Sequence, residues 1–255
     1  MSKVLAIARF TLLEAVRTRL LWLALAAVGL LLVGSVFVQQ LAITETWRVR
    51  AAFLAAGTRF ALVFVLSLHV ASSMVREFND KGIDLLLSLD LPRSRYYLGK
   101  LLGFVAVAWI LAALAALGLA TTGLSAGWLA WSLSLGLELT LIATLTLFCV
   151  ISFAQIMPAL SAVAAFYLLA RSIAAIRLLS DSQLLDQSSW ATQAAGWLVD
   201  AMALVLPDLS RFTSTDWLLV QTAAPAAVGF VLVQALVYGA LLTLAGLFDL
   251  HRRSF

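Results

Sequence analysis

Three charged residues lie inside long apolar runs, where a charge is costly. They are Arg59, Glu138 and Arg171, in the second, fourth and fifth of the runs described below. An ionisable side chain in hydrocarbon is expected to pair with an opposite charge or to line a polar route, so each is a candidate functional residue. An Arg59–Glu138 or Arg171–Glu138 pair would remove the cost of a lone charge. The alternative is that they line a substrate path, and the sequence leaves both interpretations open. The polar neighbours expected along such a path are Gln221, Gln234, Tyr167 and Tyr238.

The segment 76–100 is a second region rich in charged residues. It holds nine of the thirty charged residues of the chain within twenty-five positions, and the charges are of both signs. They surround an apolar centre of five residues, which are Ile83, Leu85, Leu86, Leu87 and Leu89. A short amphipathic helix of this kind offers leucines to a partner protein and ionic contacts at its rim. An ordinary loop is the alternative, but a passive connector rarely carries so many leucine or isoleucine residues.

The composition places these residues in a membrane protein. Of the 255 residues, 63% are hydrophobic and 12% are charged, and the mean hydropathy is +1.03. A soluble domain carries about 25% charged residues, so the chain is expected to be neither a soluble enzyme, a disordered chain nor a nucleic-acid-binding domain. One cysteine, Cys149, and two histidines, His69 and His251, exclude a disulfide framework and a zinc site built by this chain alone.

The apolar runs predict six spans, because about 20 residues cross the hydrocarbon core. Small, turn-forming residues at 121–127 divide the third run from the fourth, and Pro158 divides the fourth from the fifth. The expected spans are 20–40, 51–75, 99–121, 128–153, 158–178 and 217–248. The chain 1–255 is therefore predicted to be a single all-α polytopic membrane domain.

Three further segments are expected to be helical without spanning. Residues 3–19 have Leu5, Ala8, Leu12 and Val16 at helical spacing, which suits an interfacial helix on an anionic leaflet. The loop 77–97 would hold the amphipathic helix described above. Residues 183–213 are too apolar to float free and too interrupted to span, so short interfacial or re-entrant helices are expected there.

The distribution of Lys and Arg predicts the orientation. Six spans place residues 1–19, the loop after the second span and the C-terminus on one side, which then holds eleven Lys and Arg residues against four on the other. Both termini are therefore expected in the cytoplasm. The expected location is a bacterial-type inner (plasma) membrane, with lipid as a contact and no nucleic-acid partner.

The order of these elements resembles a known family. The opening helix "Ala-Arg-Phe-Thr-Leu-Leu-Glu-Ala-Val-Arg-Thr-Arg" (8–19) is followed by two spans and then by an acidic residue, a glycine, paired leucines, a proline-serine-arginine turn and a glycine-lysine pair. These last residues are Glu77, Gly82, Leu86, Leu87, Pro92, Arg93, Ser94, Arg95, Gly99 and Lys100. The pattern is similar to that of ABC-2 type ABC transporter permease subunits. The opening segment is also similar to that of the family's permease for copper-site maturation of nitrous oxide reductase, and to those of many exporters.

The resemblance implies a fold and a function. It implies an N-terminal interfacial helix and a cytoplasmic coupling helix at 77–91 that docks on a separate ATPase subunit. The residues it implicates in coupling are Glu77, Asp80, Lys81, Gly82, Asp84, Leu86 and Leu87. A six-span chain of 27.4 kDa is half of a plausible translocation path, so an exporter or flippase is expected to use a second permease copy, as a homodimer or a pseudo-symmetric heterodimer.

Catalysis is not expected of this chain itself. Gly99-Lys100 is followed by Leu101 and lacks the upstream glycine of a P-loop, so ATP and magnesium would bind the partner and no cofactor is expected here. Two other functions stay open: a secondary transporter or channel, and a membrane assembly scaffold that transports nothing. The sequence does not name a substrate.

Overall fold

The computed structural model describes residues 3–41, 45–80, 92–120, 127–180, 190–219 and 225–252. Within these ranges all regular structure is helical, and six helices are long and apolar enough to cross a membrane. The predicted class, an all-α polytopic membrane protein, is confirmed at this level. Which end of the bundle faces the cytoplasm stays a prediction.

The helices follow the order of the expected segments. They are α1 (Lys3–Arg17), α2 (Leu20–Leu41), α3 (Thr46–Asn79), α5 (Arg93–Ala120), α6 (Trp128–Phe153), α7 (Ile156–Ser180), α8 (Trp190–Val205), α9 (Asp216–Leu219) and α10 (Pro225–Arg252). The six candidate spans are α2, α3, α5, α6, α7 and α10.

The break between α6 and α7 has a different cause from the one expected. Pro158 does not end α6, which already stops at Phe153. Ala154 adopts a left-handed conformation with φ of 56°, and its N–H bonds to the Val150 carbonyl at 2.8 Å. Pro158 instead lies in the first turn of α7, where its missing N–H leaves no helical bond unmade.

Several helix ends differ from the predicted boundaries. The second and third spans are longer than expected, since α3 continues to Asn79 and α5 begins at Arg93, so both ends of the predicted loop 77–97 are helical. The last span begins at Pro225 rather than at residue 217, and α9 is separate from it. Of the outer segment 183–213, α8 is helical and residues 206–213 are not. The centre of the loop, 81–91, lies outside the described residues.

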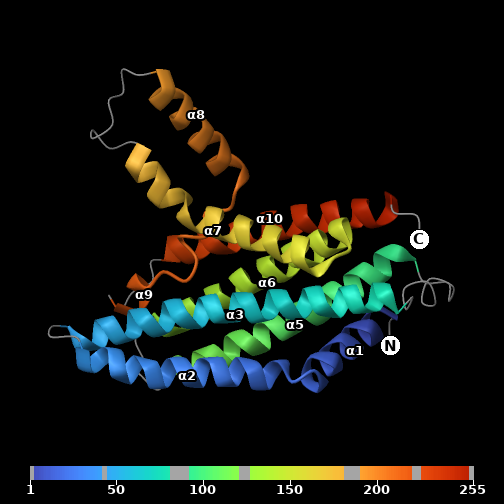
Figure 1. Cartoon of the computed structure of the whole chain (residues 1–255), viewed down its shortest axis with the longest axis horizontal. Helices are drawn as coiled ribbons and strands as arrows, with labels where there is room; N and C mark the ends of the chain where they lie inside the picture. The colour runs from blue at the N-terminus through green and yellow to red at the C-terminus, as the bar shows by residue number, and fades with distance from the viewer. Residues whose placement is uncertain are drawn as a thin grey trace.

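α6 is the central helix of the bundle, while α2 and α10 expose most of their apolar surface. Figure 1 shows both chain termini at one end of the bundle, together with the end of α3 and the beginning of α5. This placement agrees with the even number of spans. At the opposite end, α8 and the last part of α7 project away from the other helices (Figure 1).

α1 packs on α5 through two glycines one helical turn apart. A Cβ added at Gly99 would lie 2.8 Å from Cβ of Ile7, and one at Gly103 would lie 2.5 Å from Cβ of Thr11. Small residues at this spacing let two helix backbones approach closely. Two residues expected on the membrane-facing side of α1, Leu5 and Val16, remain exposed. One face of α1 is thus fixed to the bundle and another is left apolar.

A Gly103→Ala substitution is predicted to separate α1 from α5. The new methyl group overlaps Thr11 and lies 3.0 Å from the Ala8 carbonyl oxygen, so overpacking should cost about 1–3 kcal/mol. The control is Gly29→Ala in α2, where the added Cβ meets no atom within 4 Å and helix propensity improves. Thermal unfolding in detergent should show a lower melting temperature for Gly103→Ala alone. Equal melting temperatures for the two variants would contradict the close contact.

Candidate functional site

Glu138 is the centre of a buried polar cluster between α3, α6 and α7. It lies on α6 about 15 Å from the Trp128 end, and its side chain is fully buried. α7 contributes Tyr167 and, one turn later, Arg171. The remaining members are Arg59 from α3, Ser134 from α6 and Thr213 from the non-helical segment 206–215.

Both carboxylate oxygens of Glu138 are occupied. Tyr167 donates its hydroxyl to Oε1 at 3.0 Å, and Thr213 donates Oγ1–H to Oε2 at 2.7 Å. Arg171 Nη1 lies 3.8 Å from Oε1 and forms an ion pair with it. One turn before Glu138, the Ser134 hydroxyl accepts the Thr213 N–H at 2.9 Å. Glu138 and Ser134 thus hold Thr213 against α6.

The two arginines bind the backbone of the same segment. Arg171 Nη1 donates to the carbonyl oxygens of Leu209 and Phe212, the latter at 2.9 Å. Arg59 Nη1 donates to the Thr213 carbonyl at 3.4 Å and to its hydroxyl at 3.3 Å. Non-helical backbone at membrane depth needs such partners, because lipid offers none. We call this group of Arg59, Glu138, Arg171 and Thr213 the buried clamp.

Of the two charge pairs expected from the sequence, the clamp contains the one between Arg171 and Glu138. Arg171 and Glu138 are in direct contact. Among the described residues, Arg59 makes no direct ion pair with Glu138 and reaches it through the Thr213 hydroxyl. The sequence analysis missed Thr213 and Ser134. Its one usable signal was the interrupted apolar character of 183–213, which indicated a re-entrant segment without saying which residues enter the bundle.

The clamp is a set of charged and polar groups that bind one another. Its two cations and one anion leave a net charge of +1, and most of its donors and acceptors are engaged within the protein. In the part of the chain that the structure describes, no cluster of metal-ligating side chains occurs. Beside the clamp, a cavity of about 190 Å³ lies between α3 and α7. Its lining is almost entirely apolar and includes Phe60, Phe64, Val163 and Tyr167.

A second charged cluster joins α1, α3 and α5 at the end of the bundle that carries the termini. Glu14 of α1 accepts a hydrogen bond from Ser73 at 2.9 Å and pairs with Arg76, both from α3. Lys100 of α5 pairs with Glu77 of α3 and lies 3.9 Å from Glu14. We call these five residues the three-helix junction.

The structure separates the residues expected to couple to a partner. Glu77 is mostly buried, because Lys100 holds it against α5. Asp80 is exposed just beyond the end of α3. The other expected members, Lys81, Gly82, Asp84, Leu86 and Leu87, lie outside the described residues.

The junction predicts acid sensitivity through Glu14. Burial alone would raise the pKa of its carboxyl group, but the Ser73 hydrogen bond and the charges of Lys100 and Arg76 outweigh burial and lower the pKa below its usual 4.5. A carboxyl group whose pKa is lower in the folded state stabilises the fold above its unfolded-state pKa. That contribution is lost as the pH falls from about 4.5 through the lowered value.

A Glu14→Gln variant should therefore melt at a lower temperature than the wild type at pH 7, and the difference should shrink as the pH falls below 4.5. Glu45→Gln is the control, since its carboxylate is largely exposed and makes a surface pair with Arg48, which contributes little to stability. Melting temperature against pH in detergent tests this. A wild-type and Glu14→Gln difference that is constant with pH would refute it.

The clamp predicts a different response at Thr213. Thr213→Val keeps the shape and the branched Cβ but removes the hydroxyl that bonds to Glu138 and accepts from Arg59, which should cost about 2 kcal/mol. Thr213→Ser keeps the hydroxyl and removes one methyl group, which should cost about 1 kcal/mol. Thermal unfolding should rank wild type above Ser and Ser above Val. If Val is as stable as Ser, the hydroxyl does not hold the segment.

Comparison with known proteins does not assign the chain to a family. The chain matches no protein-family model, and no curated protein matches it.

Proposed function

We propose that the chain is the membrane-spanning subunit of an ABC transporter, an exporter or flippase driven by a separate ATPase subunit. The sequence pattern of the loop after the second span resembles that family's coupling region. The observation that carries the proposal is the three-helix junction, because the loop leaves the bundle from α3 and returns to it in α5 beside this junction.

The junction supports force transfer from the loop. Glu77 and Lys100 join the two helices that bracket the loop, and Glu14 ties α1 to both. The Gly99 and Gly103 contacts with α1 add close backbone packing. A push on the loop would therefore move the ends of α1, α3 and α5 together, as one rigid body.

α3 extends from the junction to the buried clamp. Arg59 and Glu77 lie on this one helix, about 27 Å apart along its axis. The clamp fixes α3 to α6 and α7 toward one end, and the apolar cavity between α3 and α7 begins beside the clamp and extends toward the junction. In the proposed mechanism, α3 pivots at the clamp and narrows or widens this cavity as the ATPase binds and hydrolyses ATP.

The exposed apolar surface is consistent with a second copy in the membrane. α10 presents a row of exposed side chains, among them Leu236, Leu241, Leu244 and Phe248. Such an apolar surface can pack against lipid tails or against another apolar helix. We propose that two copies of this chain enclose the path, each with one ATPase subunit.

Charge reversal at Asp80 and Asp84 tests the proposal. Asp80→Arg with Asp84→Arg should reduce the amount of co-purified, magnesium-dependent ATPase about tenfold, as expected for losing one or two charge-assisted contacts. Neither position belongs to the junction, so the melting temperature of the chain should stay unchanged. Glu45→Arg, at the opposite end of the bundle, should retain the ATPase fully.

Full ATPase retention by the double variant would contradict the docking assignment. Transport by vesicles that contain this chain alone, driven by an ion gradient without ATP, would contradict the proposed function as a whole and favour a secondary transporter.

A further inference from the structure

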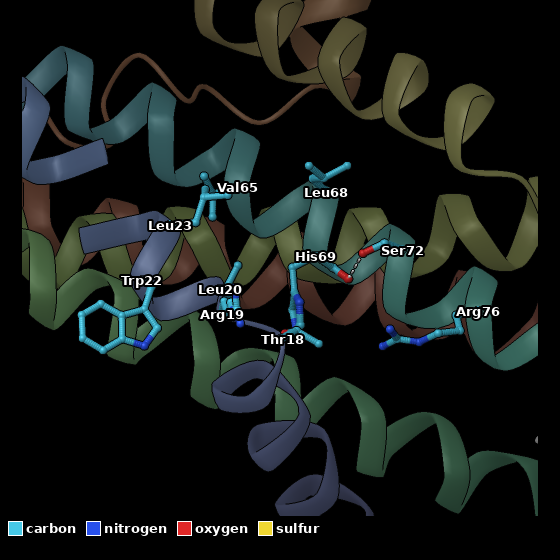
Figure 2. Close-up of a pocket in the computed structure, with 10 residues that line it drawn as sticks. All are labelled: Thr18, Arg19, Leu20, Trp22, Leu23, Val65, Leu68, His69, Ser72 and Arg76. Carbon is cyan, nitrogen blue, oxygen red and sulfur yellow. Dashed lines mark hydrogen bonds between the residues drawn. The ribbon is translucent and has the colours of Figure 1, made fainter. Parts of the chain in front are cut away.

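A cavity of about 510 Å³ lies where α1 turns into α2, against the side of α3. Its polar lining consists of Thr18, Arg19, His69, Ser72 and Arg76. Figure 2 shows the His69 ring pointing toward Thr18, with Arg76 extending toward the same space from further along α3. Three nitrogen-bearing side chains from two segments far apart in the sequence therefore meet around one cavity.

His69 lines this cavity, and its ring also carries a buried nitrogen that makes no hydrogen bond to the described part of the chain. The residue is only 6% exposed, and its Nε2 has no hydrogen-bond partner among the described residues. Its ring packs edge-on against Phe104 at 6.1 Å between centroids, which fixes its position. A buried polar atom left without a partner is costly. An external ligand with a hydrogen-bonding group would remove that cost.

Arg19 provides an uncommitted positive charge. It adopts a left-handed conformation with φ of 61°, which is uncommon and costly for a residue other than glycine. No hydrogen bond or ion pair of its side chain to the described part of the chain is found. Arg76 already pairs with Glu14, and that carboxylate is also bound by Ser73 and approached by Lys100. The polar side of the cavity thus carries an excess of positive charge.

The other side of the cavity is apolar. Leu20, Trp22 and Leu23 from α2 face Val65 and Leu68 from α3, and Trp22 is 71% exposed. Tryptophan at such a position is typical of a membrane–water interface. The cavity therefore has one positively charged side, formed by Arg19 and Arg76, and one apolar side, formed by the candidate spans α2 and α3.

We infer that this cavity binds the headgroup of an anionic phospholipid, with the phosphate between Arg19, His69 and Arg76 and the acyl chains along the α2–α3 wall. Anionic lipids concentrate in the cytoplasmic leaflet, the side on which the charge distribution places this end of the bundle. A soluble phosphate would leave the apolar wall unused. The inference requires this orientation but no ATPase partner.

The purified full-length chain, delipidated in detergent, allows a direct test by native mass spectrometry. The probes are dioctanoyl phosphatidylglycerol, dioctanoyl phosphatidylcholine and glycerol 3-phosphate. Phosphatidylglycerol should bind at least tenfold more tightly than either of the other two. Arg19→Gln should weaken its binding about fivefold, as expected for one arginine near an anionic headgroup, and Arg19→Lys should largely restore it.

Arg17→Gln is the matched control, because Arg17 is an exposed arginine nearby that does not line the cavity. It should leave phosphatidylglycerol binding unchanged. Equal binding of the two lipids, or equal weakening by Arg17→Gln and Arg19→Gln, would overturn the site in favour of general surface attraction. Glycerol 3-phosphate binding as tightly as the lipid would overturn the lipid as ligand in favour of a soluble anion.

Discussion

The fold depends on holding ten non-helical residues inside a helical membrane bundle. Local backbone N–H groups bind several carbonyl groups of residues 206–215. The carbonyl groups of Phe212 and Thr213 accept from arginine side chains instead, and hydrocarbon offers no hydrogen bonds. Arg59 and Arg171 provide the donors, and Glu138 offsets part of their charge while it holds Thr213. Charged residues that would be costly alone are therefore retained because each satisfies another buried group. The clamp also joins α3, α6 and α7, which otherwise meet through apolar contacts.

At the other end of α3, the three-helix junction also keeps poorly exposed charges by pairing them with one another. Lys100 is nearly buried, and Glu77 and Glu14 surround it with negative charge. The charged pairs fix the ends of three helices, and the glycines of α5 set how closely α1 approaches. α3 is thus held by polar contacts at two points, with an apolar cavity beside it between them. In the proposed mechanism, α3 tilts while both sets of contacts are kept.

The sequence predicts the spans well because twenty apolar residues have few alternatives to a membrane helix. It also predicts that Glu138 and Arg171 need partners, since a lone charge at that depth is too costly. It does not predict Thr213 or Ser134, because ordinary hydroxyl residues carry no signal until the chain returns to place them beside Glu138. Glu77 shows the limit of a resemblance: the family pattern implied a coupling role for it and gave no sign that Lys100, which follows it by 23 positions, pairs with it.

The central claim is that an ATPase moves the junction as one body relative to α7. Distances between spin-label pairs in the complex with its ATPase test this directly, in a Cys149→Ser background. Labels at Arg9 and Asn79, both exposed, report on the junction itself, and labels at Asn79 and Met157 report on α3 against α7. Trapping ATP should change the second distance and leave the first unchanged. A change in the first distance, or no change in either, would contradict the claim.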